Sequence, residues 1–140
     1  MKIKIRYGAL QDADGLEGMD RIAHKERKSW AIRSAREYRE IIKDSEKRVI
    51  IAELDGRLIG YLHSMVKNNR EIIWLEDIYV IKSYRKRGVA KKLVKKFVGM
   101  QRGKFRGIAL LTPDRNVRIF ERLGFKKSMN YMSMIFYRHK

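Results

Sequence analysis

Apolar residues alternate with polar residues in several stretches of the chain, and this period of two predicts β-strands. The Asp55-Gly56 pair separates two such stretches and predicts a hairpin, because an Asp-Gly pair suits the left-handed torsions of a tight turn. A second turn, at Asn68-Asn69, leads into a long apolar stretch. The expected strands cover residues 2–7, 48–54, 57–66, 71–81, 107–112 and 126–138.

Other stretches place apolar residues three or four positions apart, which predicts helices. The first helix is expected to begin at a cap formed by Asp12 or Asp14, and the second at Ser34. A third covers residues 89–100, and a fourth lies within residues 117–125. The order is therefore one strand, two helices, three strands, a helix, a strand, a helix and a strand.

This order predicts an α/β fold in which helices flank a mixed central sheet. The helix at 89–100 follows one buried strand and precedes another, so it must connect two parallel neighbours, residues 71–81 and 107–112. The length of 140 residues and the absence of a linker predict a single domain, 1–140.

From residue 84 to 91 the chain reads Tyr-Arg-Lys-Arg-Gly-Val-Ala-Lys, at the junction of a predicted strand and a predicted helix. The first N–H groups of a helix have no partner inside it, and the helix dipole is positive there. Small residues let a ligand approach this backbone, and basic residues add positive charge, so the loop is a candidate phosphate-binding site. The loop lacks the glycines of a dinucleotide-binding site and the glycines and lysine of a P-loop, so the sequence predicts neither of these two nucleotide sites here. The candidate residues are Arg85, Lys86, Arg87, Gly88, Val89, Ala90 and Lys91.

The pattern Arg85-x-x-Gly88-x-Ala90 resembles the Arg/Gln-x-x-Gly-x-Gly/Ala motif of the GNAT family of N-acetyltransferases. Residues 5–16 are similar to the first strand and first helix of that family, and residues 117–125 to its final helix with a Leu-Gly-Phe exit. The resemblance covers nearly the whole chain. It implies a GNAT-like fold with a mixed, mostly antiparallel sheet. It also implies that acetyl-CoA is the co-substrate and that the backbone amides of the loop bind the pyrophosphate of acetyl-CoA.

The resemblance also implies further site residues. In the family the strands matching 71–81 and 107–112 splay apart and the pantetheine arm binds in the gap, which assigns this role to the backbone of Ile78, Tyr79 and Val80. Many members carry a tyrosine that protonates the leaving thiolate where this chain has Phe120. Tyr131, Tyr84 or water could replace it, or the thiolate, whose pKa is about 8.5, leaves without an acid.

Asn116 stands where alanine is frequent in the family. Its side chain could cap the final helix or reach the pantetheine.

Acetyl transfer requires the acceptor amine to be neutral. A lysine-like amine, with a pKa of about 10.4, pays about 4.6 kcal/mol to be deprotonated at pH 7, whereas an α-amine pays about 1 kcal/mol. A base therefore matters most for lysine-like acceptors. Glu76 and Asp77 are the carboxylates of the long strand, and alternation predicts that they point to opposite faces. Several family members carry a glutamate that handles protons at the position of Glu76; the alternative is a structural salt bridge.

The formal charge of +18 is concentrated in residues 51–140, which carry 21 basic and 7 acidic residues. Attraction of the coenzyme phosphates explains part of it. A non-catalytic module that binds nucleic acid or ribosomes is the alternative function. We favour a basic surface of heat-adapted type over nucleic-acid binding.

The remaining features narrow the class of protein. Cysteine is absent, so disulfides and thiolate metal sites are excluded and a cytoplasmic location is expected. No apolar run is long enough to span a bilayer. His24, His63 and His139 lack the spacing of metal ligands, so we expect no metal. The expected partners are acetyl-CoA and an amine of a protein or small molecule, bound by a monomer or homodimer.

Overall fold

The computed structural model describes residues 2–28, 31–67, 69–128 and 133–137. Within them, seven strands form one sheet in the order β1-β2-β3-β4-β5-β7-β6. All neighbours are antiparallel except β4 and β5. The elements are β1 (Lys4–Tyr7), α1 (Ala13–Arg27), α2 (Ala35–Lys43), β2 (Lys47–Leu54), β3 (Arg57–Lys67), β4 (Ile72–Val80), α3 (Val89–Gln101), β5 (Gly107–Leu111), α4 (Val117–Arg122), β6 (Lys126–Ser128) and β7 (Ser133–Tyr137). Short 3₁₀ turns occupy Leu10–Asp12, Lys82–Tyr84 and Asp114–Asn116.

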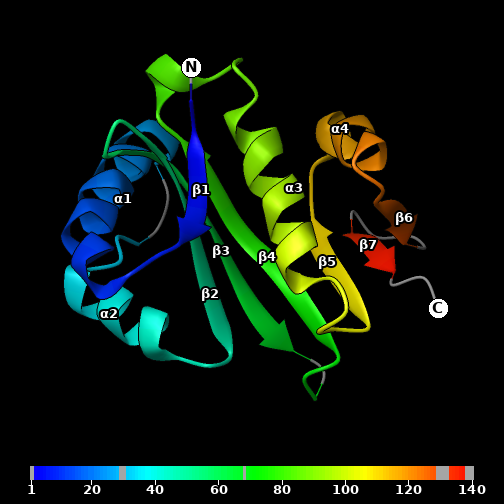
Figure 1. Ribbon diagram of the computed structural model, residues 1–140. Coiled ribbons are helices and arrows are strands. Elements are labelled where there is room, and N and C mark those ends of the chain that lie inside the picture. The colour runs from blue at the N-terminus through cyan, green and yellow to red at the C-terminus, as the bar shows by residue number, and fades with distance from the viewer. Residues whose placement is uncertain (1, 29–30, 68, 129–132, 138–140) are drawn as a thin grey trace.

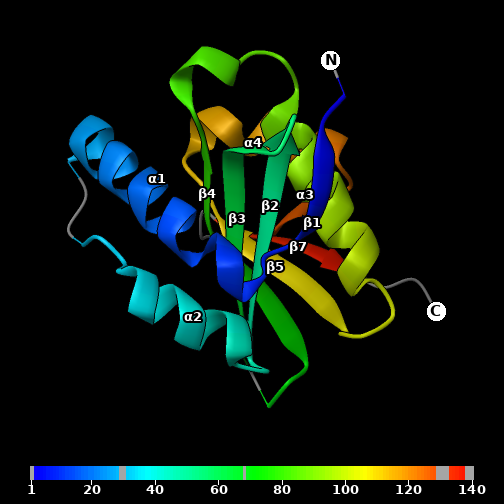
Figure 2. The same ribbon diagram turned by 60° about the vertical axis from the view of Figure 1, so that its left-hand side comes forward.

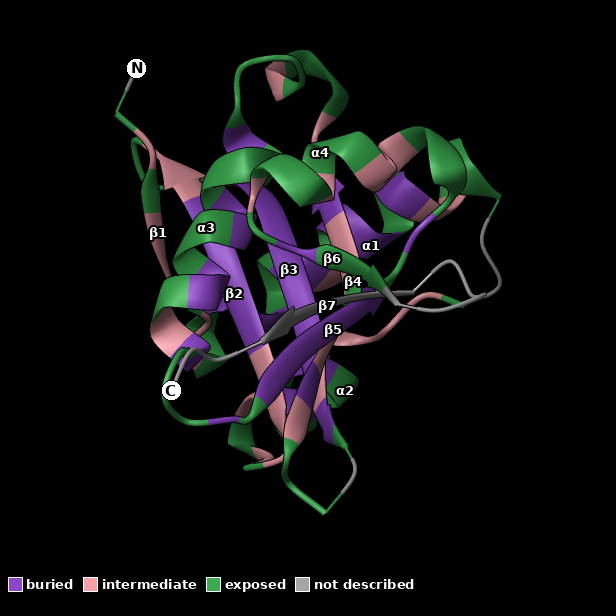
Figure 3. Cartoon of the chain, turned by 90° about the vertical axis from the view of Figure 1, so that its right-hand side faces the viewer, coloured by how far each residue is buried: buried purple, intermediate pink, exposed green. Residues whose placement is uncertain are grey.

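Helices cover both faces of the sheet (Figures 1 and 2). α1 and α2 pack on one face, where they bury Leu16, Met19 and Tyr38 against Tyr61 and Tyr79. α3 packs on the other face, and Figure 3 views the buried strands from that side. There the helical spacing of Leu93, Val94, Phe97 and Val98 places all four side chains in the core with Ile50, Leu62 and Ile73. Burial of each large apolar side chain adds about 1.5–3 kcal/mol to the stability of the folded state.

Two local predictions are confirmed. Asp55 and Gly56 have φ values of +51° and +78° between β2 and β3. The Ser34 hydroxyl accepts from the Glu37 N–H, and the Glu37 carboxylate accepts from the Ser34 N–H in return. These features depend on neighbours in the sequence.

The predicted cap of α1 is wrong. Asp12 stands at the N-cap position, but its side chain makes no capping hydrogen bond there. Its carboxylate instead accepts from the Ala9 N–H at 2.6 Å and from Arg6 of β1 at 2.8 and 3.0 Å. The strong cation draws the carboxylate away from the helix end.

The single predicted strand at 126–138 is also wrong, because β6 and β7 are two antiparallel strands. β7 lies between β5 and β6 in the sheet. The segment contains neither glycine nor proline, so its apolar pattern reads as continuous. The segment forms two strands because its second part, β7, pairs with β5, and this contact is distant in the sequence.

The two parallel strands separate part-way along their length. β4 pairs with β5 from Ile72 to Leu75 but continues beside β3 as far as Val80. A bulge interrupts the pairing with β3, because His63 lies opposite Asp77 whereas Ser64 lies opposite Leu75. Glu76 is the extra residue of the bulge. The crossover through α3 and the splayed pair are as predicted.

Gly60 of β3 should be intolerant of any side chain. A Cβ at this position would lie 2.9 Å from the backbone oxygen of Tyr79. We expect Gly60→Ala to lower the free energy of unfolding by about 2 kcal/mol, the usual range of overpacking.

In α1, a Cβ at Gly18 would meet nothing within 4 Å. Gly18→Ala should therefore raise stability by about 0.5–1 kcal/mol. Urea unfolding measures both, and a Gly60→Ala protein as stable as the parent would contradict the close packing.

Candidate active site

The loop between β4 and α3 has the geometry of an anion site. Gly88 precedes α3 with φ +80°, and Lys86 has φ +62°. The first bond of the helix runs from the Lys92 N–H to the Gly88 oxygen at 3.0 Å, and the Gly88 position makes no side-chain cap. A Cβ on Gly88 would meet nothing within 4 Å. The N–H groups of the first turn have no acceptor inside the helix, and the space beside Gly88 is open, so this helix end suits an anion.

The side chains of this loop divide into two groups. Val89, the first residue of α3, has its side chain buried in the core, so only its backbone is available to a ligand. Lys86, Ala90 and Lys91 are exposed, and the Arg87 guanidinium lies 5.7 Å from the centre of the Tyr84 ring. The predicted phosphate-binding residues are thus gathered around one helix end.

Arg85 has a different environment from its neighbours. Its Nε donates to the Val80 oxygen at 2.9 Å, and its Nη2 forms an ion pair with Glu26 of α1. Glu26 also accepts from the Tyr79 hydroxyl at 2.8 Å. The Tyr79 hydroxyl, and then Arg85, lower the pKa of Glu26. Arg85 therefore ties the loop to α1 and to the end of β4.

The free edge of β4 presents two carbonyl groups. The Ile81 N–H donates to Ile59 of β3, and hydrogen-bonded pairs alternate along antiparallel strands, so Tyr79 also directs its backbone to β3. Ile78 and Val80 direct theirs to the other side. Their oxygens accept from Arg27 at 2.6 Å and from Arg85 at 2.9 Å. Of the three predicted pantetheine residues, Ile78 and Val80 therefore present backbone to the gap.

A cavity of about 840 Å³ opens beside the bulge of β4. Glu76 and Asp77 both line it, so the expectation that they point to opposite faces is wrong. The bulge breaks the alternation of the strand between them. The lining residues come from α1, the segment before α2, β3 and β4: Asp20, Ala23, Arg27, Lys28, Ala31, Arg33, Tyr61, His63, Met65, Lys67, Glu76 and Asp77.

The two neighbouring carboxylates have different partners. The Oε1 of Glu76 lies 2.8 Å from the Lys67 Nζ, and the Glu76 side chain is 33% exposed. Asp77 accepts from Arg27 at 2.9 Å and from Arg33 at 3.0 Å. Burial raises the pKa of Asp77, but Arg27 and Arg33 outweigh it, and the pKa lies below its usual value. Asp77 is therefore an ionised, weakly basic group.

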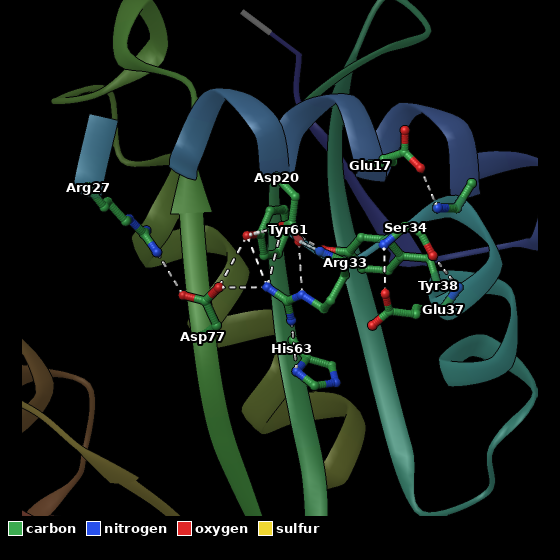
Figure 4. A network of polar contacts seen from close by, with 11 residues as sticks. Glu17, Asp20, Arg27, Arg33, Ser34, Glu37, Tyr38, Tyr61, His63 and Asp77 are labelled. Carbon is green, nitrogen blue, oxygen red and sulfur yellow. Dashed lines mark hydrogen bonds and ion pairs between the residues drawn. The ribbon is translucent and has the colours of Figure 1, made fainter. Parts of the chain in front are cut away.

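A buried network organises the wall of the cavity (Figure 4). Asp20 of α1 is 4% exposed and accepts from the Arg33 N–H at 2.8 Å and the Arg33 Nε at 3.0 Å. The hydroxyls of Tyr38 and Tyr61 lie 2.8 Å from the same carboxylate. Burial raises the pKa of both tyrosines, so they remain protonated donors. Arg33 thereby fixes the segment before α2 against α1 and β3.

Sequence reasoning missed this network, although one signal was present. Asp20 follows Leu16 by four residues and precedes Ala23 by three, so it lies on the apolar face of α1. A carboxylate on a buried helix face requires a partner. Its partner Arg33 lies beyond the helix and could not be identified by spacing.

His63 completes the wall below Arg33. It is 8% exposed, and its Nδ1 lies 3.2 Å from the Arg33 Nη1. A guanidinium can only donate, so Nδ1 accepts and the proton of the neutral ring is on Nε2. Nε2 is buried and has no hydrogen-bond partner among the described residues. Burial, and then the Arg33 charge, lower the pKa of His63 to about 4.

The remaining predicted residues lie away from the cavity. Asn116 precedes α4 but makes no side-chain cap, so the capping interpretation is wrong. Phe120 packs edge-on against Phe125, with ring centres 5.8 Å apart, at the α3 side of the sheet. Tyr131 lies outside the described residues. In the described part of the chain no cluster of acidic or histidine side chains could hold a metal ion, and no helix there could cross a membrane.

Comparisons with known proteins agree with this geometry. The model of the acetyltransferase (GNAT) family matches residues 16–125. Aminoglycoside N(6')-acetyltransferase type 1 of Salmonella typhimurium is 27% identical over 112 residues, which cover 72% of this chain and 75% of the relative.

Solved structures share the whole architecture. The PaiA N-acetyltransferase of Thermoplasma acidophilum, in complex with coenzyme A, superposes with a TM-score of 0.77 at 19% identity over 100% of both chains. A GNAT family acetyltransferase of Brucella melitensis, in complex with acetyl-CoA, gives a TM-score of 0.76 at 19% identity and covers 99% of this chain and 90% of its own.

Acid should destabilise the protein through His63. Its pKa is about 4 when folded, against an ordinary 6.5, so the unfolded state takes up the proton first. The stabilisation is present above pH 6.5 and is lost as pH falls towards 4. Between pH 7 and pH 5 the loss is about 2 kcal/mol.

His63→Gln keeps an acceptor for Arg33 but does not titrate. We expect the free energy of unfolding of this variant, measured in urea, to change by about 2 kcal/mol less between pH 7 and pH 5. Carboxylates with a lowered pKa, such as Asp77, lose their contribution only below this window. An identical pH dependence in both proteins would show that His63 titrates normally.

Proposed function

This chain belongs to the acetyltransferase (GNAT) family and is therefore an N-acetyltransferase that uses acetyl-CoA, and we propose that its acceptor is a primary amine of a protein or small molecule. The amine attacks the thioester directly in a ternary complex. The observation that carries the proposal is that one continuous strand, β4, connects the cavity to the loop. Glu76 and Asp77 of β4 line the cavity. The next residues direct the Ile78 and Val80 carbonyls into the gap beside β5, and the loop follows, beginning at Arg85.

We assign the coenzyme to the gap and the loop. The free N–H groups of Val89, Ala90 and Lys91 would receive the pyrophosphate, with the nearby cations of Lys86 and Lys91 adding attraction. The amide groups of the pantetheine would bond the Ile78 and Val80 carbonyls. Because Arg27 and Arg85 occupy these carbonyls in the structure, the two guanidinium groups would give way when the coenzyme binds.

Glu76 is the proposed proton acceptor. It stands in the bulge between the cavity and the gap, so an amine that enters the cavity meets it next to the thioester. Lys67 holds the Oε1 of Glu76, which leaves Oε2 for the amine or for a bridging water. The cost of about 4.6 kcal/mol for a lysine-like amine at pH 7 is the energetic reason for a base.

Phe120 stands where many family members carry the tyrosine that protonates the leaving thiolate. Phe120 has no proton to donate and packs on Phe125. With a pKa of about 8.5, the thiolate can leave as an anion or take a proton from water. Tyr84 and Tyr131 remain candidate donors.

Gly88→Trp should abolish coenzyme binding without unfolding the protein. The indole would fill the space in front of the helix end, where a Cβ meets nothing within 4 Å. A matched control is Gly103→Trp, since Gly103 has a similar φ of +86°, and a Cβ there also meets nothing within 4 Å. Both substitutions lower the free energy of unfolding by about 1 kcal/mol through backbone strain. By calorimetry only the first should lose acetyl-CoA affinity, and equal affinities would remove the loop from the site.

Glu76→Gln should slow acetylation of a lysine-like acceptor at pH 7 by about 10²-fold, the usual effect of losing a general base. The defect should shrink at pH 9–10, where the solvent supplies neutral amine, and should be smaller for α-amines. Coenzyme affinity should barely change.

A structural role for the Glu76–Lys67 pair predicts a different result. Lys67→Gln breaks the same ion pair but keeps the carboxylate, so its rate should fall less. Equal defects in the two variants, with no change in pH dependence, would show that Glu76 acts only through the pair.

A further inference from the structure

The carboxylates of the cavity are already neutralised by groups of the protein. Asp20 is bonded by Arg33 and two tyrosines, Asp77 by Arg27 and Arg33, and Glu76 by Lys67. An ammonium group that enters must therefore compete with an existing ion pair. A molecule with several ammonium groups would have to break several.

The charges that line the cavity favour an anion over a cation. Its lining carries four cationic side chains, Arg27, Lys28, Arg33 and Lys67, against three carboxylates. Lys28 ends α1 in a left-handed conformation with φ +53°, and its side chain is exposed. No described residue forms an ion pair with Lys28. The cavity therefore has an excess positive charge at the end of α1.

A second donor in the same cavity also lacks a partner. His63 carries its proton on Nε2, because Nδ1 accepts from Arg33, and this buried N–H is unsatisfied among the described residues. An unmet buried donor costs about 1–3 kcal/mol, but this nitrogen is closed off from solvent in the structure, so the anion is assigned to Lys28 and not to His63. Arg33 does not suit the anion either, since its donors already bond Asp20, His63 and Asp77.

We propose that the amine acceptor also carries an anionic group, a carboxylate in the simplest case, which binds at Lys28 while the amine lies beside Glu76. This rests on the proposed function and names its substrate class. The carboxylate could belong to a free amino acid or to an acidic residue near a peptide N-terminus. Polycations such as polyamines and aminoglycosides do not fit this charge pattern, although the Salmonella typhimurium relative is named for the latter.

Matched acceptors test the proposal directly. Thiol release from acetyl-CoA would be compared for the α-amides of L-glutamate and L-glutamine, for the peptides Ser-Glu-Ala and Ser-Gln-Ala with amidated C-termini, and for spermidine and kanamycin. At low salt we expect kcat/KM to favour the anionic member of a pair by about fivefold or more. The preference should decline as salt shortens the Debye length. The pair that shows the effect identifies a free amino acid or a peptide as the source.

Lys28→Gln provides the residue-level test. It should lower kcat/KM for the anionic acceptor more than for its neutral partner, and so reduce the ratio of the two. Lys25→Gln is the control, because Lys25 lies on the same helix, is exposed and does not line the cavity. It removes the same charge and should keep the ratio.

The outcomes separate the two levels of the proposal. If spermidine or kanamycin is the better acceptor, or if Lys28→Gln keeps the ratio of the parent, the anionic substrate class is wrong while acetyl transfer stands. If the protein binds acetyl-CoA by calorimetry but acetylates no amine, the proposed function fails as well.

Discussion

The separation of β4 from β5 after Leu75 is the constraint on which the rest of the structure depends. Beyond that point one edge of β4 carries backbone carbonyls that its neighbour no longer satisfies. Arg27 and Arg85 donate to them, from α1 and from the loop. The same opening thus brings the helix, the loop and the strand together, and the bulge at Glu76 turns adjacent carboxylates into one cavity.

Charge is distributed unevenly around this opening. Residues 82–128 contain sixteen lysines and arginines and the acids Asp114 and Glu121. On the other face, ion pairs join α1, the segment before α2, β3 and β4, with Asp20 and Asp77 among their acids. The α3 side therefore has a field that attracts the phosphates of a coenzyme, whereas the cavity has an excess of one cation, with four cationic side chains against three carboxylates.

The sequence predicted best what depends on neighbours in the chain. The Asp55-Gly56 turn, the Ser34 cap and the loop at Gly88 need only a few consecutive residues, and the helical spacing of Leu93 and Phe97 identified a core face. The bulge at Glu76 depends on pairing across the sheet, which a period of two cannot show. The Asp20–Arg33 contact and the loss of the Asp12 cap likewise depend on cations that other elements deliver.

The buried network around Arg33 is better understood as a device for geometry than as a source of stability. Removing charges from water costs several kcal/mol per ion, and paired buried charges often only offset that cost. What the network secures is position. Arg33 bonds Asp20 and Asp77 at once, and so ties the segment before α2 to both α1 and β4. Because Asp77 is held in this way, it cannot serve freely as a site for an incoming cation, and the chemistry of the cavity is left to Glu76 and Lys28.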